Sequence, residues 1–375
     1  MSSIMKRLAI LSTHPIQYNA PLFRILHEDD SIELCVFFSK TWDQVKFDPD
    51  FQREIVWDIP VFEGYRNSTH DASTKAGKRD LKRAIQSFQP DAILVYGWNF
   101  PGHLAMMRTF HGKIPVWFRG DSHLLDPLPL WKKIARRKLL KWVYRHIDFA
   151  FTVGTANEAY YQWCGLKPRQ WIRAPHAVNN VFFEKDDEER KALAMQWRTT
   201  LGISRTDRTI LFAGKLEHKK QPEFLIQAWS RLDDPTCHIL IVGSGPQESS
   251  LRQRWGHHPR VHFLGFQNQT AMPTLYRMAD VYCLPSAGPG ETWGLAVNEA
   301  LASGTPCVVS DRAGCSKDMS AASNDVLVAS HHNVNEWIEA IKNVLSTPQP
   351  RPSSIPSEFN HTRFVQAIQT TLCHG

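Results

Sequence analysis

Short, wholly apolar runs alternate with amphipathic segments along this chain of 375 residues. In the first half, the runs occupy 7–12, 33–38, 91–96, 115–118 and 148–153. In the second half, they occupy 208–214, 238–243, 261–265, 280–285, 306–310 and 325–329. Strands buried on both faces of a parallel sheet have this composition, whereas half-exposed strands alternate apolar with polar residues. The pattern therefore predicts an α/β fold with two doubly wound, Rossmann-like domains.

The amphipathic segments predict helices between these strands. We expect them at 20–28, 77–88, 101–111, 128–146 and 155–164, and then at 222–232, 246–255, 271–278, 294–303 and 334–346. A charged stretch, 184–200, separates the halves, so the predicted domains are 1–185 and 186–355. Two such domains facing each other would leave a cleft at the carboxyl ends of both sheets, where folds of this kind bind ligands.

The composition excludes several classes of protein. A hydrophobic fraction of 42% and a charged fraction of 22% are typical of a globular chain, not of a disordered, collagen-like or coiled-coil one. The seven cysteines form no CxxC pair, which argues against a zinc site or a disulfide framework and favours a reducing compartment. No apolar run reaches about 18 residues, so no membrane span is predicted. The early run RLAILS is interpreted as a first strand, not as part of a signal peptide.

The densest group of chemically useful residues lies in the stretch PSAGPGETWGLAVNEALASG. A loop passes Thr292, a candidate N-cap, and enters a helix whose first N–H groups, at Gly294 and Leu295, would form an anion site. Glu291 on the loop and Glu299 two turns into the helix could accept hydrogen bonds, one from sugar hydroxyls and the other from a ribose diol. The alternative is that Glu291 is a solvated loop charge and Glu299 an ordinary helix-surface residue.

Two lysines follow the first strand of the second half. Gly214 ends that strand, Lys215 comes directly after it, and Lys220 stands at the start of the next helix. Ammonium groups at the carboxyl edge of a sheet can neutralise a departing diphosphate as it gains charge. The alternative is a lysine-rich, solvated turn. The nearby VGSGP (242–246) indicates either a close approach of backbone to a ligand or a tight turn.

These motifs together resemble a known family. Gly214-Lys215-Leu216 with Lys220, VGSGP, FLGF (263–266), and Glu291-Thr-Trp-Gly-Leu with Glu299-Ala are similar to the C-terminal domain of retaining GT-B glycosyltransferases of family 4. The resemblance spans about 206–330, and APHAVNNVFF (174–183) is similar to the segment that closes the family's N-terminal domain. The resemblance implies a GT-B fold, two Rossmann-like domains facing across a cleft. It also implies that a last helix, within 356–375, crosses back to the first domain.

The resemblance also implies roles for individual residues. Lys215 and Lys220 would hold the diphosphate of a nucleotide sugar, although the family more often has Arg at the first position. Glu299 would bind the ribose and Glu291 the donor sugar, and Phe266 lies where the backbone usually meets the base. No metal ion or other cofactor is implied. Attack would come from the front face, with the leaving phosphate taking the acceptor proton.

The first half is expected to bind the acceptor. His14 lies in a glycine-free loop, THPIQYNAPLF, that resembles a bacterial subgroup of the family, and it either faces the cleft or is satisfied by backbone. Asp121 occupies the position where the family commonly has a reactive-site His, with Arg119 and His123 as further candidates for sugar or acceptor contacts. An Arg–Asp pair that only fixes this loop is the alternative. Trp98, with the aromatic residues Trp42, Trp57 and Tyr65, could form an acceptor groove or simply pack.

The segment 131–145 (WKKIARRKLLKWVYR) contains seven basic residues and no acidic one, with apolar residues interleaved. Such a helix could lie on an anionic membrane surface. Equally, it could pack its apolar stripe on the sheet and leave its basic face in solvent.

The favoured hypothesis is a retaining glycosyltransferase that moves a sugar from a nucleotide diphosphate sugar to a hydroxyl of a glycan or lipid-linked acceptor. Its setting would be bacterial glycan, glycolipid or cell-surface polysaccharide synthesis, in the cytoplasm and, if 131–145 binds lipid, at the inner face of the membrane. The rivals are a phosphorylase or sugar epimerase of the same fold, and a non-catalytic sugar-binding protein. A DNA-modifying glucosyltransferase or nucleic-acid-binding protein that uses 131–145 ranks lower, because no separate DNA-binding motif is present, and no nucleic-acid partner is expected.

Overall fold

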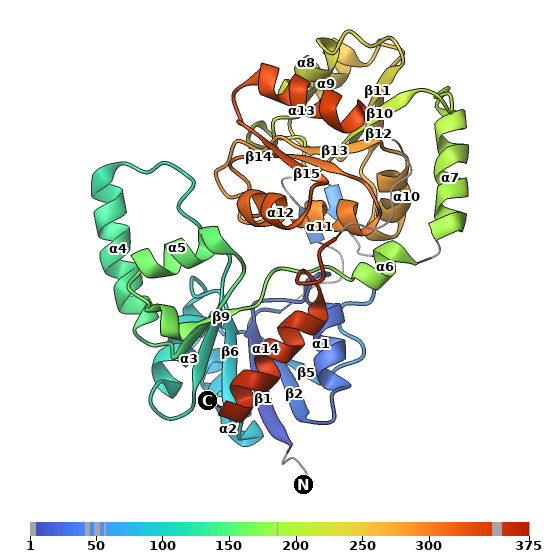
Figure 1. Ribbon diagram of the computed structural model, residues 1–375. Coiled ribbons are helices and arrows are strands. Elements are labelled where there is room, and N and C mark those ends of the chain that lie inside the picture. Colours follow the sequence, from blue (N-terminus) through green and yellow to red (C-terminus); the bar gives the residue numbers. More distant parts are fainter. Residues whose placement is uncertain are drawn as a thin grey trace. The chain divides into compact units, whose positions relative to one another are not determined.

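The computed structural model describes residues 5–41, 46–48, 53–55, 58–185, 187–346 and 355–374. It divides into two compact units, each built around one parallel sheet (Figure 1). The first unit comprises Met1–Gln44, Pro60–Asn179 and Asn360–Gly375, and the second comprises Val45–Ile59 and Asn180–Phe359. The segment 45–59, which the sequence analysis placed in the first domain, thus belongs to the second unit. Trp42 and Trp57, two members of the expected aromatic groove, lie outside the described residues.

The sheet of the first unit has seven parallel strands in the order β5-β2-β1-β6-β7-β8-β9. The strands are β1 (Lys6–Ser12), β2 (Ile32–Phe38), β5 (Asn67–Thr69), β6 (Ala92–Tyr96), β7 (Val116–Arg119), β8 (Phe149–Thr152) and β9 (Trp171–Arg173). The helices are α1 (Ala20–His27), α2 (Lys75–Phe88), α3 (Pro101–Phe110), α4 (Leu130–Tyr144), α5 (Thr155–Trp163), the short η1 (Pro168–Gln170) and α14 (His361–His374).

Neighbouring residues of β1 enter two different cores, because a strand directs successive side chains to opposite faces of its sheet. Leu8 and Ile10 pack in a cluster that contains residues of α1 and α14. Ala9 and Leu11 pack in a second cluster with residues of α2, α3, α4 and α5. The last helix, α14, therefore covers the same face of this sheet as α1, far from it in sequence (Figure 1).

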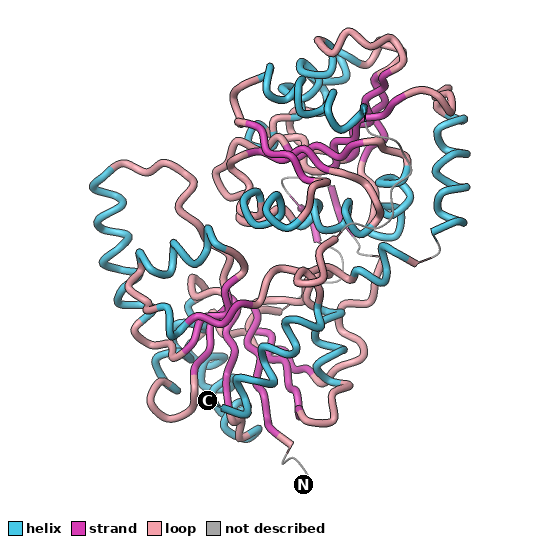
Figure 2. The backbone as a smooth tube through the Cα atoms, in the orientation of Figure 1, coloured by secondary structure: helices cyan, strands magenta, loops and turns pink. Residues whose placement is uncertain are grey.

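The sheet of the second unit has six parallel strands in the order β12-β11-β10-β13-β14-β15. The strands are β10 (Arg208–Ala213), β11 (Cys237–Val242), β12 (Val261–Gly265), β13 (Val281–Leu284), β14 (Cys307–Ser310) and β15 (Val326–Ala329), and an antiparallel pair is formed by β3 (Lys46–Asp48) and β4 (Arg53–Ile55). The helices are α6 (Asn180–Glu184), α7 (Asp187–Thr200), η2 (His218–Lys220), α8 (Pro222–Ser230), α9 (Glu248–Trp255), η3 (Gln269–Ala271), α10 (Met272–Arg277), α11 (Leu295–Ala302), α12 (Ser316–Ala322) and α13 (Val334–Ser346). Helices cover both faces of the strands in each unit (Figure 2).

The expected strands and helices are present, with their ends displaced by a few residues. The structure adds the short strands β3, β4, β5 and β9 and the helices α6 and α12, which the sequence analysis did not predict. It also shows that most of the charged stretch 184–200 is helical, as α7. Within the described ranges, no helix combines the length and the apolar character needed to cross a membrane.

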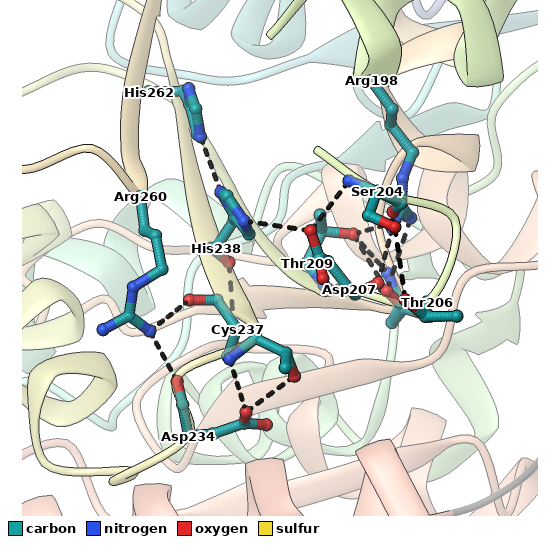
Figure 3. Close-up of polar contacts among 12 residues, drawn as sticks. Arg198, Ser204, Thr206, Asp207, Thr209, Asp234, Cys237, His238, Arg260 and His262 are labelled. Carbon is teal, nitrogen blue, oxygen red and sulfur yellow. Dashed lines mark hydrogen bonds and ion pairs between the residues drawn. The ribbon is translucent and has the colours of Figure 1, made fainter. Parts of the chain in front are cut away.

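A polar network lies across the amino ends of three strands of the second sheet (Figure 3). His238 Nδ1 lies 2.9 Å from His262 Nε2, and His238 Nε2 lies 3.4 Å from Asp207 Oδ2. Arg260 donates a hydrogen bond of 3.2 Å to the carbonyl of Cys237. Burial, helped by the neighbouring His238, lowers the pKa of His262 to about 4. Because these residues lie at the amino ends of β10, β11 and β12, the network is at the edge opposite to the one where such sheets bind ligands.

Candidate functional site

The order of the strands in the second unit defines one place where loops diverge. The chain leaves β10 toward β11 and β12 and later returns to β13 on the other side of β10, so β10 and β13 are neighbours. In doubly wound sheets, ligands bind at the carboxyl ends of the strands at such a switch point. The loop after β10 carries Lys215 and the loop after β13 carries Glu291. The structure therefore brings the two main motifs of the sequence analysis to one site.

Close backbone packing fixes the loop after β10. The N–H of Gly214 donates to the carbonyl of Val242, and the N–H of Leu216 donates to that of Ser244, both at 3.0 Å. A Cβ atom on Gly243 would lie only 1.9 Å from the carbonyl oxygen of Gly214, and Gly243 has a φ of +131°. Only glycine fits there. Gly243 of the VGSGP motif therefore packs directly on the backbone of the Lys215 loop and helps to hold it.

Lys220 and Glu291 form an ion pair, although they are separated by 71 residues. The hydroxyl of Ser286 donates a 2.6 Å hydrogen bond to the same carboxylate oxygen of Glu291. The N–H of Ala287 donates to the carbonyl of Lys219 at 2.8 Å, which ties the two loops together. Both charged side chains are mostly buried, so removal of one would leave the other poorly compensated. Glu291 is thus not a solvated loop charge, and Lys220 is not a solvated lysine.

Glu299 is buried, with 3% of its surface exposed, and the alternative that made it a helix-surface residue is wrong. Its carboxylate accepts a hydrogen bond of 2.9 Å from the side-chain amide of Gln269 and one of 2.7 Å from the hydroxyl of Tyr276. These donors come from η3 and α10, which pack beside α11. An ionised carboxylate has about four lone-pair sites, so it can accept hydrogen bonds from a ligand as well.

The helix α11 begins one residue later than expected. Gly294 is its N-cap, in the left-handed region with a φ of 101°, and Leu295 is its first residue. Thr292 is therefore not the N-cap, and this prediction was wrong. A Cβ on Gly294 would lie 2.7 Å from the Leu284 side chain, which would have to shift, and the φ of 101° is one that side chains rarely adopt. The first N–H groups of an α-helix lack partners within the helix, which suits them to bind an anion. Leu295 and, after β12, Phe266 are partly buried.

The first unit has the same kind of switch point, between β1 and β6. His14 follows β1, where its Nδ1 lies 3.0 Å from the hydroxyl of Thr13, and Trp98 follows β6, where it packs partly against the core. The buried His103 contacts the carbonyl of Gly97 at 2.9 Å and the hydroxyl of Ser39 at 2.7 Å, and so holds the loop that carries Trp98.

The next strand of this sheet, β7, ends at a group of polar residues. Arg119 is buried, donates to the carbonyl of Ala174 at 2.8 Å and lies over the ring of Phe364. These contacts lie within the first unit, and the expected contact of Arg119 with sugar or acceptor is not supported by its burial. His123 is also buried, and its Nδ1 accepts from the N–H of Leu125 at 3.2 Å.

Asp121 pairs with a histidine that the sequence analysis did not propose. His176 Nε2 lies 3.8 Å from Asp121 Oδ2, and its Nδ1 lies 3.4 Å from Arg119. Burial lowers the pKa of His176 and so disfavours its protonated form. His176 follows β9, a strand that was not predicted. The signal that could have identified it is its position at a strand end, within the segment 174–183 that resembles the family.

No group of three or more His, Cys, Asp and Glu side chains placed to hold a metal ion occurs in the part of the chain that the structure describes. The positive charge at the second-unit site comes from Lys215, Lys220 and the start of α11. This arrangement can bind a polyanion between two loops, with two carboxylates beside it to accept hydrogen bonds from hydroxyl groups.

Sequence comparisons find known proteins that are similar to part of this chain. Residues 195–356 match the family model described as glycosyl transferases group 1. An uncharacterized glycosyltransferase of Methanocaldococcus jannaschii is 36% identical over 124 residues, and a D-inositol 3-phosphate glycosyltransferase of Mycobacterium bovis is 32% identical over 157 residues. These alignments cover 32% and 40% of this chain, and only about a third of each relative (31% and 32%).

Solved structures resemble the chain over nearly its whole length. A sucrose-phosphate synthase from Thermosynechococcus elongatus has a TM-score of 0.72 at 18% identity, covering 98% of both chains. Anabaena HepE, solved in complex with UDP and glucose, has a TM-score of 0.67 at 15% identity, covering 99% of this chain and 100% of that one. A UDP-GlcNAc 2-epimerase from Methanocaldococcus jannaschii has a TM-score of 0.62 at 13% identity, with the same coverage.

The chain therefore has the GT-B fold of glycosyltransferases, with two Rossmann-like domains. Residues 195–356, within its second unit, match the glycosyl transferases group 1 family model, and the site at the β10–β13 switch point lies within the matched residues.

Proposed function

We propose that this protein is a retaining glycosyltransferase that moves a sugar from a nucleotide diphosphate sugar to an acceptor hydroxyl. The observation that carries the proposal is the convergence of Lys215, Lys220, Glu291 and Glu299 on the loops and helix around the β10–β13 switch point. It is supported by the family match of this domain and by the UDP and glucose bound to a protein of the same fold.

Each residue has a role that its chemistry suits. The diphosphate would lie at the start of α11, with Lys215 and Lys220 beside it, and the carboxylate of Glu299 would accept hydrogen bonds from the ribose diol. Glu291, placed by Ser286 and Lys220, would accept hydrogen bonds from hydroxyls of the donor sugar. Two lysines and a helix terminus supply positive charge for the diphosphate, so the proposal includes metal-independent transfer.

The proposed reaction forms one bond and breaks one. The acceptor oxygen bonds to the anomeric carbon while the bond from that carbon to the diphosphate oxygen breaks. The acceptor proton passes to the leaving phosphate on the same face, which accounts for retention. Negative charge grows on the diphosphate during this step, so lysine contacts strengthen in the transition state.

The setting that we propose is bacterial glycan, glycolipid or cell-surface polysaccharide synthesis in the cytoplasm. The acceptor would be a glycan or a lipid-linked molecule on the side of the first unit that carries His14, Trp98, Asp121 and His123. A sugar epimerase is the second candidate, favoured by the likeness in fold to the UDP-GlcNAc 2-epimerase.

Two measurements test the proposal. Thermal shifts with UDP, GDP, ADP and CDP identify the base, and release of the matching nucleoside diphosphate from nucleotide sugars then reports turnover. Lys220→Ala should lower kcat by about 10²- to 10³-fold, with a smaller change in KM. Interconversion of sugar isomers with no new glycosidic bond would favour the epimerase. If the folded protein binds a nucleotide but turns over no nucleotide sugar, both the glycosyltransferase and the epimerase proposals are contradicted.

A further inference from the structure

The helix α4 has an exposed apolar surface that nothing in the described structure covers. Residues 130–139 are all exposed, and Leu140, Val143 and Tyr144 near its end are buried. The exposed fractions are 73% for Leu130, 68% for Trp131, 51% for Ile134 and 48% for Leu139. Of the twelve large apolar side chains exposed among the described residues, six lie between 124 and 139. Such clustering marks an interaction surface.

The exposed apolar residues do not lie on the side of the helix that faces the domain. At about 100° per residue, positions 131, 134 and 138 share one face of an α-helix, and positions 140, 143 and 144 lie on the opposite face. Trp131 and Ile134 therefore point away from the sheet that Leu140 and Val143 pack against. The interpretation that the apolar stripe packs on the sheet applies only to the last turns of α4.

Basic residues surround this apolar face. The segment 131–145 has seven basic residues and no acidic one. Two of them contact α5, since Arg137 donates to the carbonyl of Trp163 at 3.0 Å and Arg136 lies over the ring of Tyr160. Lys138 shares the face of Trp131 and Ile134, and Lys132 lies beside the Trp131 ring.

The helix α2 of the same unit shows that these features are not a general property of the fold. It is also basic, with Arg79 and Arg83 exposed, but it buries Leu81, Ile85 and Phe88 and has no large apolar side chain among the exposed ones. An outer helix that only covers the sheet has this pattern. Helix α4 differs because its apolar residues are presented outward together with its charges.

We propose that α4 docks this protein on an anionic lipid bilayer, with Leu130, Trp131 and Ile134 entering the interface and Lys132 and Lys138 contacting lipid headgroups. Charge complementarity selects an anionic surface, and the outward Trp and aliphatic side chains select lipid over the phosphate backbone of a nucleic acid. Attachment to the bilayer through α4 requires neither the sugar donor, nor the acceptor substrate, nor catalytic turnover.

If the proposed function holds, this surface also indicates which class of acceptor substrate the enzyme uses. The loop that follows β7 carries Asp121 and His123 and then leads, through the exposed Leu124 and Leu128, into α4. The candidate acceptor residues are thus joined by one short loop to the docking surface. This placement favours an acceptor that is itself anchored in the bilayer.

The test is flotation of the full chain with phosphatidylcholine vesicles that contain or lack about 30% phosphatidylglycerol. The wild type should bind the anionic vesicles, less at high salt, and bind neutral ones weakly. Lys132→Gln/Lys138→Gln should weaken this binding roughly 30-fold, since each basic side chain near such a surface contributes a factor of about five. Trp131→Ser/Ile134→Ser should weaken it at high salt as well. Both double variants should melt as the wild type does, because these side chains are exposed.

The matched control is Arg79→Gln/Arg83→Gln on α2, which removes the same charge and should change vesicle binding less than about twofold. Equal losses for this control and the α4 variants would overturn the proposal, as would failure of the wild type to bind anionic vesicles. Binding to duplex DNA with a steep salt dependence, in place of vesicle binding, would assign α4 to nucleic acid. Nucleoside diphosphate release, measured without vesicles, reports the transferase separately, so the two proposals can fail independently.

Discussion

Replacement of Glu299 by Ala should impair both stability and nucleotide binding, and the two effects can be separated. The carboxylate is the acceptor for the amide of Gln269 and the hydroxyl of Tyr276, which are themselves buried. A buried donor left without an acceptor costs about 1–2 kcal/mol. Loss of the carboxylate leaves both donors without an acceptor and should therefore lower the free energy of unfolding by about 2–4 kcal/mol. In a unit of this size, that corresponds to a decrease in Tm of roughly 5–15 °C.

Nucleotide binding should weaken as well, if Glu299 accepts hydrogen bonds from the ribose. Hydrogen bonds to a charged group contribute about 1.5–3 kcal/mol, so the Kd for the nucleoside diphosphate should rise roughly 10- to 100-fold. Titration calorimetry well below the lowered Tm measures this directly. The matched control is Tyr276→Phe, which removes one donor and keeps the carboxylate. It should lower stability by about 1 kcal/mol and change Kd less than about threefold.

Two results would refute this reasoning. An unchanged Tm for Glu299→Ala would show that the hydrogen bonds to Gln269 and Tyr276 contribute nothing, and an unchanged Kd would remove the ribose role. A Kd that rises equally in Glu299→Ala and Tyr276→Phe would show that the binding loss comes from general loosening of α10 and α11.

Three further predictions follow from the same geometry. Lys215→Ala should lower kcat by about 10²-fold with a smaller change in KM, whereas Lys215→Arg should keep most activity; equal losses in steady-state assays would count against a role for charge alone. Gly294→Ala should lower Tm by several degrees, because its φ of 101° is strained for alanine and a Cβ would displace the Leu284 side chain, and Gly202→Ala, at a φ of 71° with open space around it, should cost less. The stability of the second unit should fall as pH drops from about 6.5 to about 4, since unfolded His262 takes up a proton that the folded residue, with its pKa near 4, does not. In His262→Gln, the loss of unfolding free energy between these two pH values should be smaller by about 1–3 kcal/mol, as measured by melts across this range. An unchanged dependence of stability on pH would show that His262 is not the responsible group.

Much of the fold could be predicted because its strands are apolar throughout. Strands such as β11, buried at every position, can be recognised without knowledge of their neighbours. The edge strand β5 is only Asn-Ser-Thr and has no such signal, because it becomes a strand through its pairing with β2. Likewise, α12 combines polar with small residues and lacks a clear apolar stripe.

The residues of the candidate site could be selected from the sequence, but their contacts could not. Lys215, Lys220, Glu291 and Glu299 could be selected because each lies near a strand or helix end in a motif of the family. The pairing of Lys220 with Glu291, and the burial of Glu299 under η3 and α10, depend on segments that are distant in sequence. Adjacent polar residues in α11, Asn298 and Glu299, look like a solvent-facing side, yet both are buried.

The position of α14 has a consequence for synthesis of the chain on the ribosome. One face of the first unit's sheet is covered in part by Phe364, Val365, Ile368 and Leu372 of α14, which are translated after the second unit. Domains generally fold as units in the order in which they emerge. Here the first unit cannot complete its core until α14 has left the ribosome, by which time the whole of 180–359 has already been synthesised. The nascent first unit must therefore wait with the α14-binding face of β1 exposed, and it is this half of the protein, not the later one, that we expect chaperones to protect during translation.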